Sequence, residues 1–484
     1  MSMPLLSYND ILALDATSLS NALENSDIGI VELMKATLHQ VDRVNPSVHA
    51  IVSLRDRNEL MEEAAQASRS PRKGWLHGIP IAIKDLSNCK GIPTTFGGSP
   101  LFKDFVPGQS DPFVQRLIDA GAIVIGKTNT PESGLGSHTF NKRWGTTRNP
   151  CNLSRSAGGS SGGAAVAVAT HILVLADGSD MMGSLRNPAG WNNLYSIRPT
   201  AGMLEYLESD RNPLDYPIST VGPIARSPED LARCLETMAG SDRFQAPLDS
   251  FQASMEQLDM KGLKIAWLGD WAGAYPVEKD ILGLCRLALC TFEKMGVEID
   301  DMKKPIFPAN KLWKSWTTIR SAVISSVEIL VHGKDALRKS NIRSELKWEV
   351  ERGLTISDEE LAAAGFIAKE WSVRLEQLFT EGYDAIALPS AQVWPFPVDW
   401  DWPKEISGRR MDTYHRWMEI AVPISLAGLP CVTIPAGFGA DSGVSMGIQI
   451  AGRRGEDAKL LQIANAYHGS TGWHSRQPEC SDIS

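Results

Sequence analysis

Apolar positions along this chain switch repeatedly between the spacing of a helix and that of a strand. Residues 29–44 repeat apolar side chains every three or four positions, which predicts an amphipathic helix ending at Asn45-Pro46. The neighbouring segments predict strands at 50–53, 79–83 and 122–125 and helices at 57–67 and 112–120. Such alternation is typical of an α/β fold with a largely buried sheet.

The middle of the chain holds two clusters rich in glycine and serine. Residues 158–163 are all glycine or serine, and glycine lets bare backbone and hydroxyl groups come close to a ligand. A helix of small residues at 164–170 and a buried strand at 172–176 separate this cluster from a second one at 177–184. No strand is predicted at 153–157. This order of elements can bring both serine clusters into one cleft.

The second half of the chain continues the alternation of helices and strands. Helices are predicted at 229–238, 278–295, 414–426 and 457–467, and strands at 264–268, 297–299, 383–389, 431–434 and 445–450. Residues 308–378 have a helical pattern, whereas 394–402 form a loop dense in aromatic residues and proline. The tail from Gly469 is expected to be loosely ordered.

Composition and charge narrow the functional classes. Of 484 residues, 43% are hydrophobic and 22% charged, which is the balance of a globular protein. The net charge of −9 argues against nucleic acid as a partner, because phosphate binding needs basic clusters. The seven cysteines are odd in number and lack paired spacing, which favours a reducing compartment. With no leader and no apolar stretch of about 20 residues, we predict a cytoplasmic protein without membrane contact.

The two serine clusters resemble the amidase signature family, serine hydrolases that cleave carboxamide C–N bonds. The matching motifs are Gly158-Gly159-Ser160-Ser161-Gly162-Gly163 and Gly178-Ser179-Asp180-Met181-Met182-Gly183-Ser184-Leu185-Arg186-Asn187-Pro188-Ala189. Further similar segments are His77–Asp85, Gly126–Glu132, Asn149-Pro150, Gly428–Gly437 and Gly447–Gln449. The match covers most of the chain and is weakest between about residues 227 and 383.

The resemblance implies an α/β fold in which a single large mixed sheet is surrounded by helices. We therefore expect one domain over residues 1–484, with 156–189 as its catalytic core. The region of about 308–420, where the resemblance fades, is predicted to cover the substrate site and set the substrate range.

The same resemblance assigns the catalytic residues. Ser184 matches the nucleophile, Ser160 the bridging serine that follows a cis peptide bond, and Lys84 the base. Elementary chemistry agrees, because a serine hydroxyl needs a base and a lysine with an ordinary pKa of about 10.4 is protonated at neutral pH. Burial lowers the pKa of a lysine, and Lys84 ends the apolar run at 79–83.

Other residues are expected to support these three. The resemblance implies an oxyanion hole formed by the backbone N–H groups of Met181, Met182, Gly183 and Ser184, which are donors fixed before charge develops. Met182 stands where the family usually has glycine, and a positive φ there would strain a methionine. Ser161 is predicted to lie near Lys84, Asp180 and Arg186 to form an ion pair, and Gly134, Leu135, Gly158 and Gly159 to contact the substrate.

Two short motifs in the chain are interpreted as coincidences. Gly121–Thr128 fits the phosphate-loop pattern, but the residues between its glycines, Ala-Ile-Val-Ile, predict a strand. Gly159–Gly163 fits G-x-S-x-G, which in α/β hydrolases follows a strand that is not predicted here. No metal-ligand spacing is present among the histidines, and no metal or cofactor is predicted.

The predicted function is hydrolysis of a small-molecule amide through an acyl-enzyme. Carbamates and aryl esters share the carbonyl and leaving group, so they stay open as substrates. One alternative is the glutaminase subunit of an amidotransferase, which would need partner chains, whereas the amidase would act as a monomer or homodimer. A non-catalytic or nucleotide-binding protein is the other alternative.

Overall fold

The computed structural model describes residues 7–204, 214, 216–240 and 258–473, and its centre is an eight-stranded mixed sheet. In spatial order the strands are β12 (Glu298–Asp301), β11 (Lys264–Trp267), β13 (Ala385–Pro389), β17 (Ser445–Ala451), β16 (Cys431–Phe438), β9 (Tyr195–Arg198), β10 (Thr220–Ala225) and β8 (Leu175–Asp180). Strand β11 runs parallel to both its neighbours, and all other pairs are antiparallel. The predicted mixed α/β fold is confirmed.

A second, three-stranded sheet lies beside the large one. It contains β1 (Ile51–Val52), β3 (Ile123–Thr128) and β2 (Pro80–Lys84), in that order, with β2 and β3 parallel. The strands predicted at 79–83 and 122–125 therefore form a sheet of their own. A side chain links the two sheets, because the Lys84 N–H donates to Asp177 Oδ1 of β8 at 2.8 Å.

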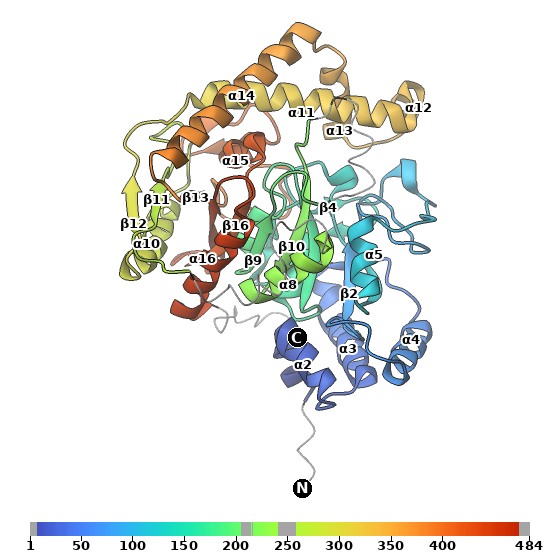
Figure 1. Cartoon of the computed structure of the whole chain (residues 1–484). Helices are drawn as coiled ribbons and strands as arrows, with labels where there is room; N and C mark the ends of the chain where they lie inside the picture. Colours follow the sequence, from blue (N-terminus) through green and yellow to red (C-terminus); the bar gives the residue numbers. More distant parts are fainter. Residues whose placement is uncertain (1–6, 205–213, 215, 241–257, 474–484) are drawn as a thin grey trace.

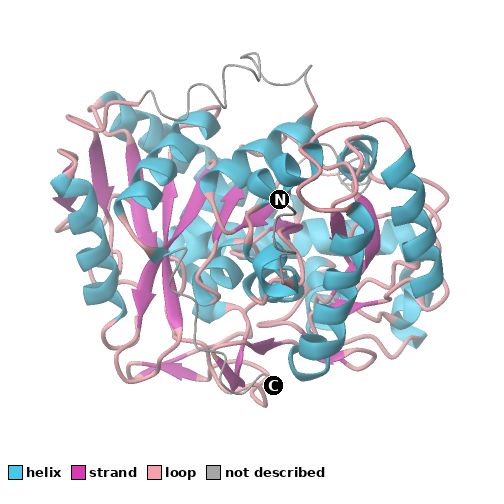
Figure 2. Ribbon diagram, turned by 90° about the horizontal axis from the view of Figure 1, so that it is seen from below, coloured by secondary structure: helices cyan, strands magenta, loops and turns pink. Residues whose placement is uncertain are grey.

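Helices surround both sheets, as Figures 1 and 2 show. They are α1 (Tyr8–Ala13), α2 (Ala16–Glu24), α3 (Ile30–Val48), α4 (Arg57–Arg69), α5 (Pro112–Asp119), α6 (Gly162–Ala169), α7 (Arg186–Trp191), α8 (Pro228–Ala239), α10 (Ile281–Lys294), α11 (Ala309–His332), α12 (Lys334–Lys339), α13 (Ser344–Gly353), α14 (Asp358–Thr380), α15 (Val422–Ala427) and α16 (Asp457–Ser470). Helices α8, α10 and α16 pack against the large sheet, as do α6 and α7. Helices α11 to α14 form a layer at the top of Figure 1.

Three strand predictions differ from the structure. Strand β8 begins at Leu175 and runs through the polar cluster to Asp180, because β10 pairs with it from Ala225 to Thr220. Strands β9 and β10 were not predicted. Residues 152–156, expected not to be a strand, form β7 (Asn152–Ser156), which pairs only with β6 (Arg148–Asn149) in a small ribbon. Two further short pairs join β4 (Phe140–Asn141) to β5 (Gly145–Thr146) and β14 (Glu405–Ile406) to β15 (Arg409–Arg410).

Helix ends also differ from their predicted positions. Helix α3 continues through Pro46, since a proline in the last turn removes only one backbone hydrogen bond, and ends at His49 with φ of 52°. The predicted helix at 414–426 divides into a 3₁₀ helix, Arg416–Ala421, and α15. The closing helix extends to Ser470, so Gly469 is helical, and the rest of the predicted tail from 474 lies outside the described residues. Within the described ranges, the helices lack the length and hydropathy that a bilayer span requires.

Candidate active site

Lys84 is the last residue of β2 and is fully buried. Its Nζ lies 2.8 Å from Ser160 Oγ, 2.7 Å from Ser161 Oγ and 2.9 Å from Ser179 Oγ. The apolar strand places the amine in the interior, while two segments supply the hydroxyl groups that surround it. We call Lys84, Ser160, Ser161 and Ser179 the lysine cluster.

The surroundings of Lys84 favour its neutral form. Burial lowers the pKa of the amine to about 7, although the nearby carboxylates of Asp177 and Asp180 oppose that change. Burial also raises the pKa of Asp177 to about 6. A lysine with a pKa of about 7 is half deprotonated at neutral pH, so this amine can accept a proton where an ordinary lysine cannot.

The first serine cluster turns tightly behind Ser160. The Gly159–Ser160 peptide bond is cis, as the resemblance implied. Gly159 exchanges two backbone hydrogen bonds of 3.0 Å with the side chain of Asn187. A Cβ on Gly159 would lie 2.9 Å from the Cα of His138, so only glycine fits this close approach. Gly158 likewise faces Asn187 and Pro188, and both glycines position the serine loop instead of contacting the substrate as predicted.

The carboxylate of Asp180 organises the loop that carries Ser184. It accepts the N–H of Gly183 at 2.8 Å and that of Leu185 at 3.1 Å. The positive φ in this loop, 90°, belongs to Gly183, and Met182 does not have a positive φ. The N–H of Gly183 is therefore turned toward Asp180, which leaves Met181, Met182 and Ser184 as the freer donors among the four that were predicted.

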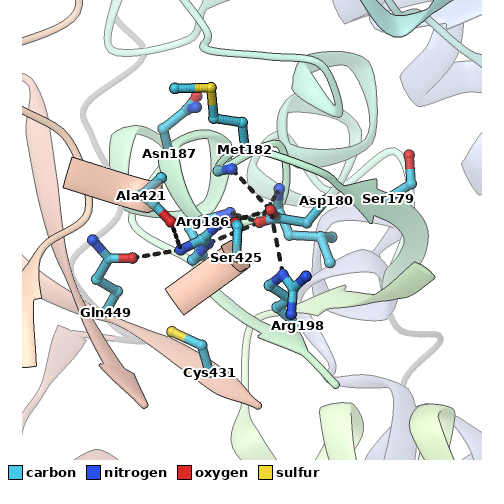
Figure 3. Close-up of polar contacts among 12 residues, drawn as sticks. Ser179, Asp180, Met182, Arg186, Asn187, Arg198, Ala421, Ser425, Cys431 and Gln449 are labelled. Atoms are coloured by element: carbon cyan, nitrogen blue, oxygen red, sulfur yellow. Dashed lines mark hydrogen bonds and ion pairs between the residues drawn. The ribbon is translucent and has the colours of Figure 1, made fainter. Parts of the chain in front are cut away.

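Met182 is accommodated by packing beneath helix α11. Its side chain is only 3% exposed, and Trp316 Nε1 of α11 donates to its sulfur at 3.2 Å. In Figure 3 this side chain points away from the ion pair below it. The backbone conformation at Met182 is one that any residue can adopt, so the strain considered from the sequence does not arise.

Asp180 and Arg186 form the predicted ion pair, completely buried (Figure 3). Arg186 donates twice to Asp180, at 2.9 and 3.0 Å, and its other three N–H groups are also satisfied. Their acceptors are Ala421 O at 3.1 Å, Gln449 Oε1 at 2.8 Å and Ser425 Oγ at 2.6 Å. Burial would raise the pKa of Asp180, but Arg186 and Arg198 outweigh it and hold that pKa below its ordinary value.

A cavity of about 470 Å³ opens beside the lysine cluster. Ser160, Ser179 and Ser184 border it together with Met181 and Met182. Ser184 is half-buried, and among the described residues no direct hydrogen bond joins its hydroxyl to that of Ser160. The catalytic serines thus share one cavity, with Ser160 in contact with the lysine.

The remaining wall of the cavity is largely apolar. Gly134 and Leu135, predicted as substrate contacts, border it. So do Leu86, Phe96, Leu204, Ile218, Val221 and Met418, and one face of α11 that presents Arg320, Val323, Ile324, Val327 and Glu328. The region of about 308–420 therefore contributes directly to the wall, although its limits as a covering region stay a prediction.

Several residues of the site were not identified from the sequence. Ser179 lies inside a quoted motif, but its hydroxyl gave no sign that it would meet the lysine. The sequence marks Asp177 only as part of a polar cluster. Lys127, the lysine of the phosphate-loop pattern, sits in strand β3 and donates to the carbonyl of Ser87 inside the protein. Ser161, the centre of G-x-S-x-G, is fully buried against Lys84, so the absence of that elbow rests on this contact and not on the missing strand.

Comparison with known proteins places the whole chain in one group. The family model described as Amidase matches residues 32–461. An acylamidase of Rhodococcus erythropolis is 33% identical over 480 residues, which cover 96% of this chain and 97% of that protein. One of the subunits of the glutamyl-tRNA(Gln) amidotransferase of Moorella thermoacetica is 32% identical over 502 residues, covering 97% and 99%.

A solved structure shows the same architecture. A bacterial aryl acylamidase of the amidase signature family superposes with a TM-score of 0.85 at 25% sequence identity, covering 99% of this chain and 98% of that one. The similarity extends through the helices α11 to α14, where the sequence resemblance was weakest.

Proposed function

This chain belongs to the amidase signature family, and we propose that it hydrolyses carboxamides through an acyl-enzyme on Ser184. The observation that carries the proposal is a buried lysine with a pKa of about 7 whose amine contacts Ser160 at the edge of a cavity that Ser184 also borders. That arrangement supplies a base, a relay and a nucleophile.

The reaction would proceed by proton transfer through the lysine cluster. The neutral amine of Lys84 takes the proton of Ser160 as Ser160 takes that of Ser184, whose Oγ attacks the amide carbonyl. The N–H groups of Met181, Met182 and Ser184 would stabilise the negative oxygen. The proton returns through Ser160 to the nitrogen of the leaving amine. Water, activated by the same base, then attacks the ester on Ser184 and releases the carboxylic acid.

Carbamates and aryl esters would follow the same steps, because each has a carbonyl next to a leaving group. The relation to the glutamyl-tRNA(Gln) amidotransferase keeps glutamine as a second candidate. Glutamine carries an α-carboxylate, however, and the only lysine or arginine among the described residues that border the cavity is Arg320, which is already paired with Glu349. We therefore favour uncharged amides and a single-chain enzyme, as monomer or homodimer in the cytoplasm.

The test is release of amine from a panel of aryl amides, alkyl amides, carbamates, aryl esters and glutamine. Wild type is compared with Ser184→Ala, Lys84→Ala and Ser133→Ala, the last removing a serine that borders the cavity without a hydrogen bond to Lys84. We expect the first two variants to lose at least about a thousandfold in kcat and Ser133→Ala to stay near wild type. Mass spectrometry of a slow ester substrate should show the acyl group on Ser184.

Equal turnover by wild type and Ser184→Ala would refute the proposed nucleophile. Turnover of glutamine alone, and only after a partner chain is added, would favour the role of an amidotransferase component.

A further inference from the structure

Helix α11 presents one charged side chain in an otherwise apolar part of the cavity wall. Val323, Ile324 and Val327 border the cavity at the spacing of one helix face, and Arg320 continues this face by one turn. Arg320 is only 4% exposed. A guanidinium placed among apolar residues at a cavity wall requires partners for its charge and for its N–H groups.

The charge of Arg320 is neutralised on the side away from the cavity. Its Nη1 donates to Glu349 of α13, which is fully buried and also accepts from Tyr414 at 2.9 Å and Ser321 at 2.6 Å. Arg320 Nη2 donates to the Tyr414 hydroxyl at 2.8 Å. Glu349 thus has its full set of donors, and the pair as a whole carries no net charge.

The N–H groups of Arg320 are only partly used. A guanidinium has five N–H hydrogens, and the described residues accept two hydrogen bonds from Arg320, with none from Nε. Arg186 in the same protein donates all five. Arg320 therefore keeps spare donors beside the cavity, and a buried donor without an acceptor is unfavourable until a ligand supplies one.

Other charges at the cavity wall decide which acceptor fits. Glu328 borders the cavity near Arg320 on the same helix, and Asp111 borders it as well. Because Glu349 already balances Arg320, a carboxylate on the substrate would meet a wall with excess negative charge. An uncharged oxygen, such as that of a ketone, ether or second amide, accepts the hydrogen bond without this penalty.

From this geometry we propose that Arg320 is a specificity-determining residue that donates a hydrogen bond to an uncharged oxygen of an otherwise apolar substrate. The inference rests on the proposed function only in taking this cavity as the substrate site. It narrows the substrate class to neutral amides that carry a second oxygen acceptor apart from the scissile carbonyl, and it disfavours their carboxylate analogues.

Binding to Ser184→Ala tests the inference without depending on turnover. Calorimetry would measure Kd for two matched series of anilides, one varied in the acyl chain and one in the amine, each with a hydrocarbon, a ketone and a carboxylate of similar length. For the ketone in at least one series we expect binding roughly tenfold tighter than for the hydrocarbon, and for the carboxylate weaker binding than for either.

Two variants in the same background separate the roles of Arg320 and Glu349. Arg320→Met combined with Glu349→Gln avoids leaving a buried charge unpaired and should abolish the preference for the ketone while the Kd of the hydrocarbon changes less than about threefold. Glu349→Gln alone keeps the donors but frees the positive charge, so the carboxylate should gain roughly tenfold in affinity. Thermal unfolding checks that each variant is folded.

Equal Kd values for ketone and hydrocarbon in both series, no binding of either, or a preference that survives the double substitution would overturn the inference. These outcomes are distinct from failure of the proposed function, which appears as wild-type turnover unaffected by Ser184→Ala.

Discussion

Replacing Asp177 by asparagine should move the pH dependence of the reaction. The pKa of about 7 at Lys84, against an ordinary 10.5, corresponds to roughly 5 kcal/mol in favour of the neutral amine. Burial alone would lower the pKa further, because Asp177 and Asp180 both favour the protonated amine. With its own pKa of about 6, Asp177 is about nine-tenths ionised at pH 7, where Lys84 titrates.

The sign of the effect follows from the role of the base. Only neutral Lys84 accepts a proton, so kcat/KM of wild type should rise with pH, with a midpoint near 7. Asp177→Asn removes a charge that favours the protonated amine, which should lower that midpoint by about one pH unit. At pH 6 the variant should then retain a larger fraction of its plateau rate than wild type retains of its own.

The assay is kcat/KM for an uncharged amide from pH 5 to 9, since this ratio reports groups of the free enzyme. Asp230→Asn is the matched control, because Asp230 is also a buried carboxyl whose pKa burial raises to about 6, but it accepts the N–H groups of Ala16 and Thr17 and is not among the charges acting on Lys84. An unshifted midpoint in Asp177→Asn, or the same shift in both variants, would show that the reasoning is wrong.

Three further changes test the supporting structure. Arg186→Met removes five buried hydrogen bonds and should destabilise the fold by about 3–5 kcal/mol in urea unfolding, whereas Arg374→Met, at a partly exposed pair, should cost less than about 1 kcal/mol; similar losses would contradict the role of the buried pair. Met182→Gly empties the space beneath Trp316 and should cost about 2–5 kcal/mol while speeding turnover of bulkier amides, and unchanged thermal stability would count against this packing. Gly159→Ala places a Cβ 2.9 Å from the Cα of His138 and should lower kcat at least tenfold, whereas Gly108→Ala, with nothing within 4 Å, should not; equal rates would mean that the serine loop tolerates the shift.

The sequence predicted most of the strands that have a clear apolar pattern, and through the family motifs it placed Lys84 beside Ser160 and Ser161. Strand β10 was missed because its Gly222-Pro223 pair reads as a turn, whereas pairing along the whole of β8 makes it a strand. The glycines at 158 and 159 were assigned to the substrate because a motif does not show which side of a loop faces the cavity. Arg320 lay in a region of helical pattern where polar positions ordinarily face solvent, and only the packing of α11 against α13 shows that it turns inward.

The anchoring of Arg186 has a consequence for how the enzyme is made. All the side chains of the lysine cluster, and Ser184 itself, have been synthesised by residue 184, yet the acceptors that hold Arg186 come 235 to 263 residues later in the chain. A nascent polypeptide on the ribosome therefore contains every reactive group well before the loop around Ser184 can be fixed. Strand β17 must emerge and join the sheet first, so a product truncated before residue 421 would carry the chemistry without a formed site.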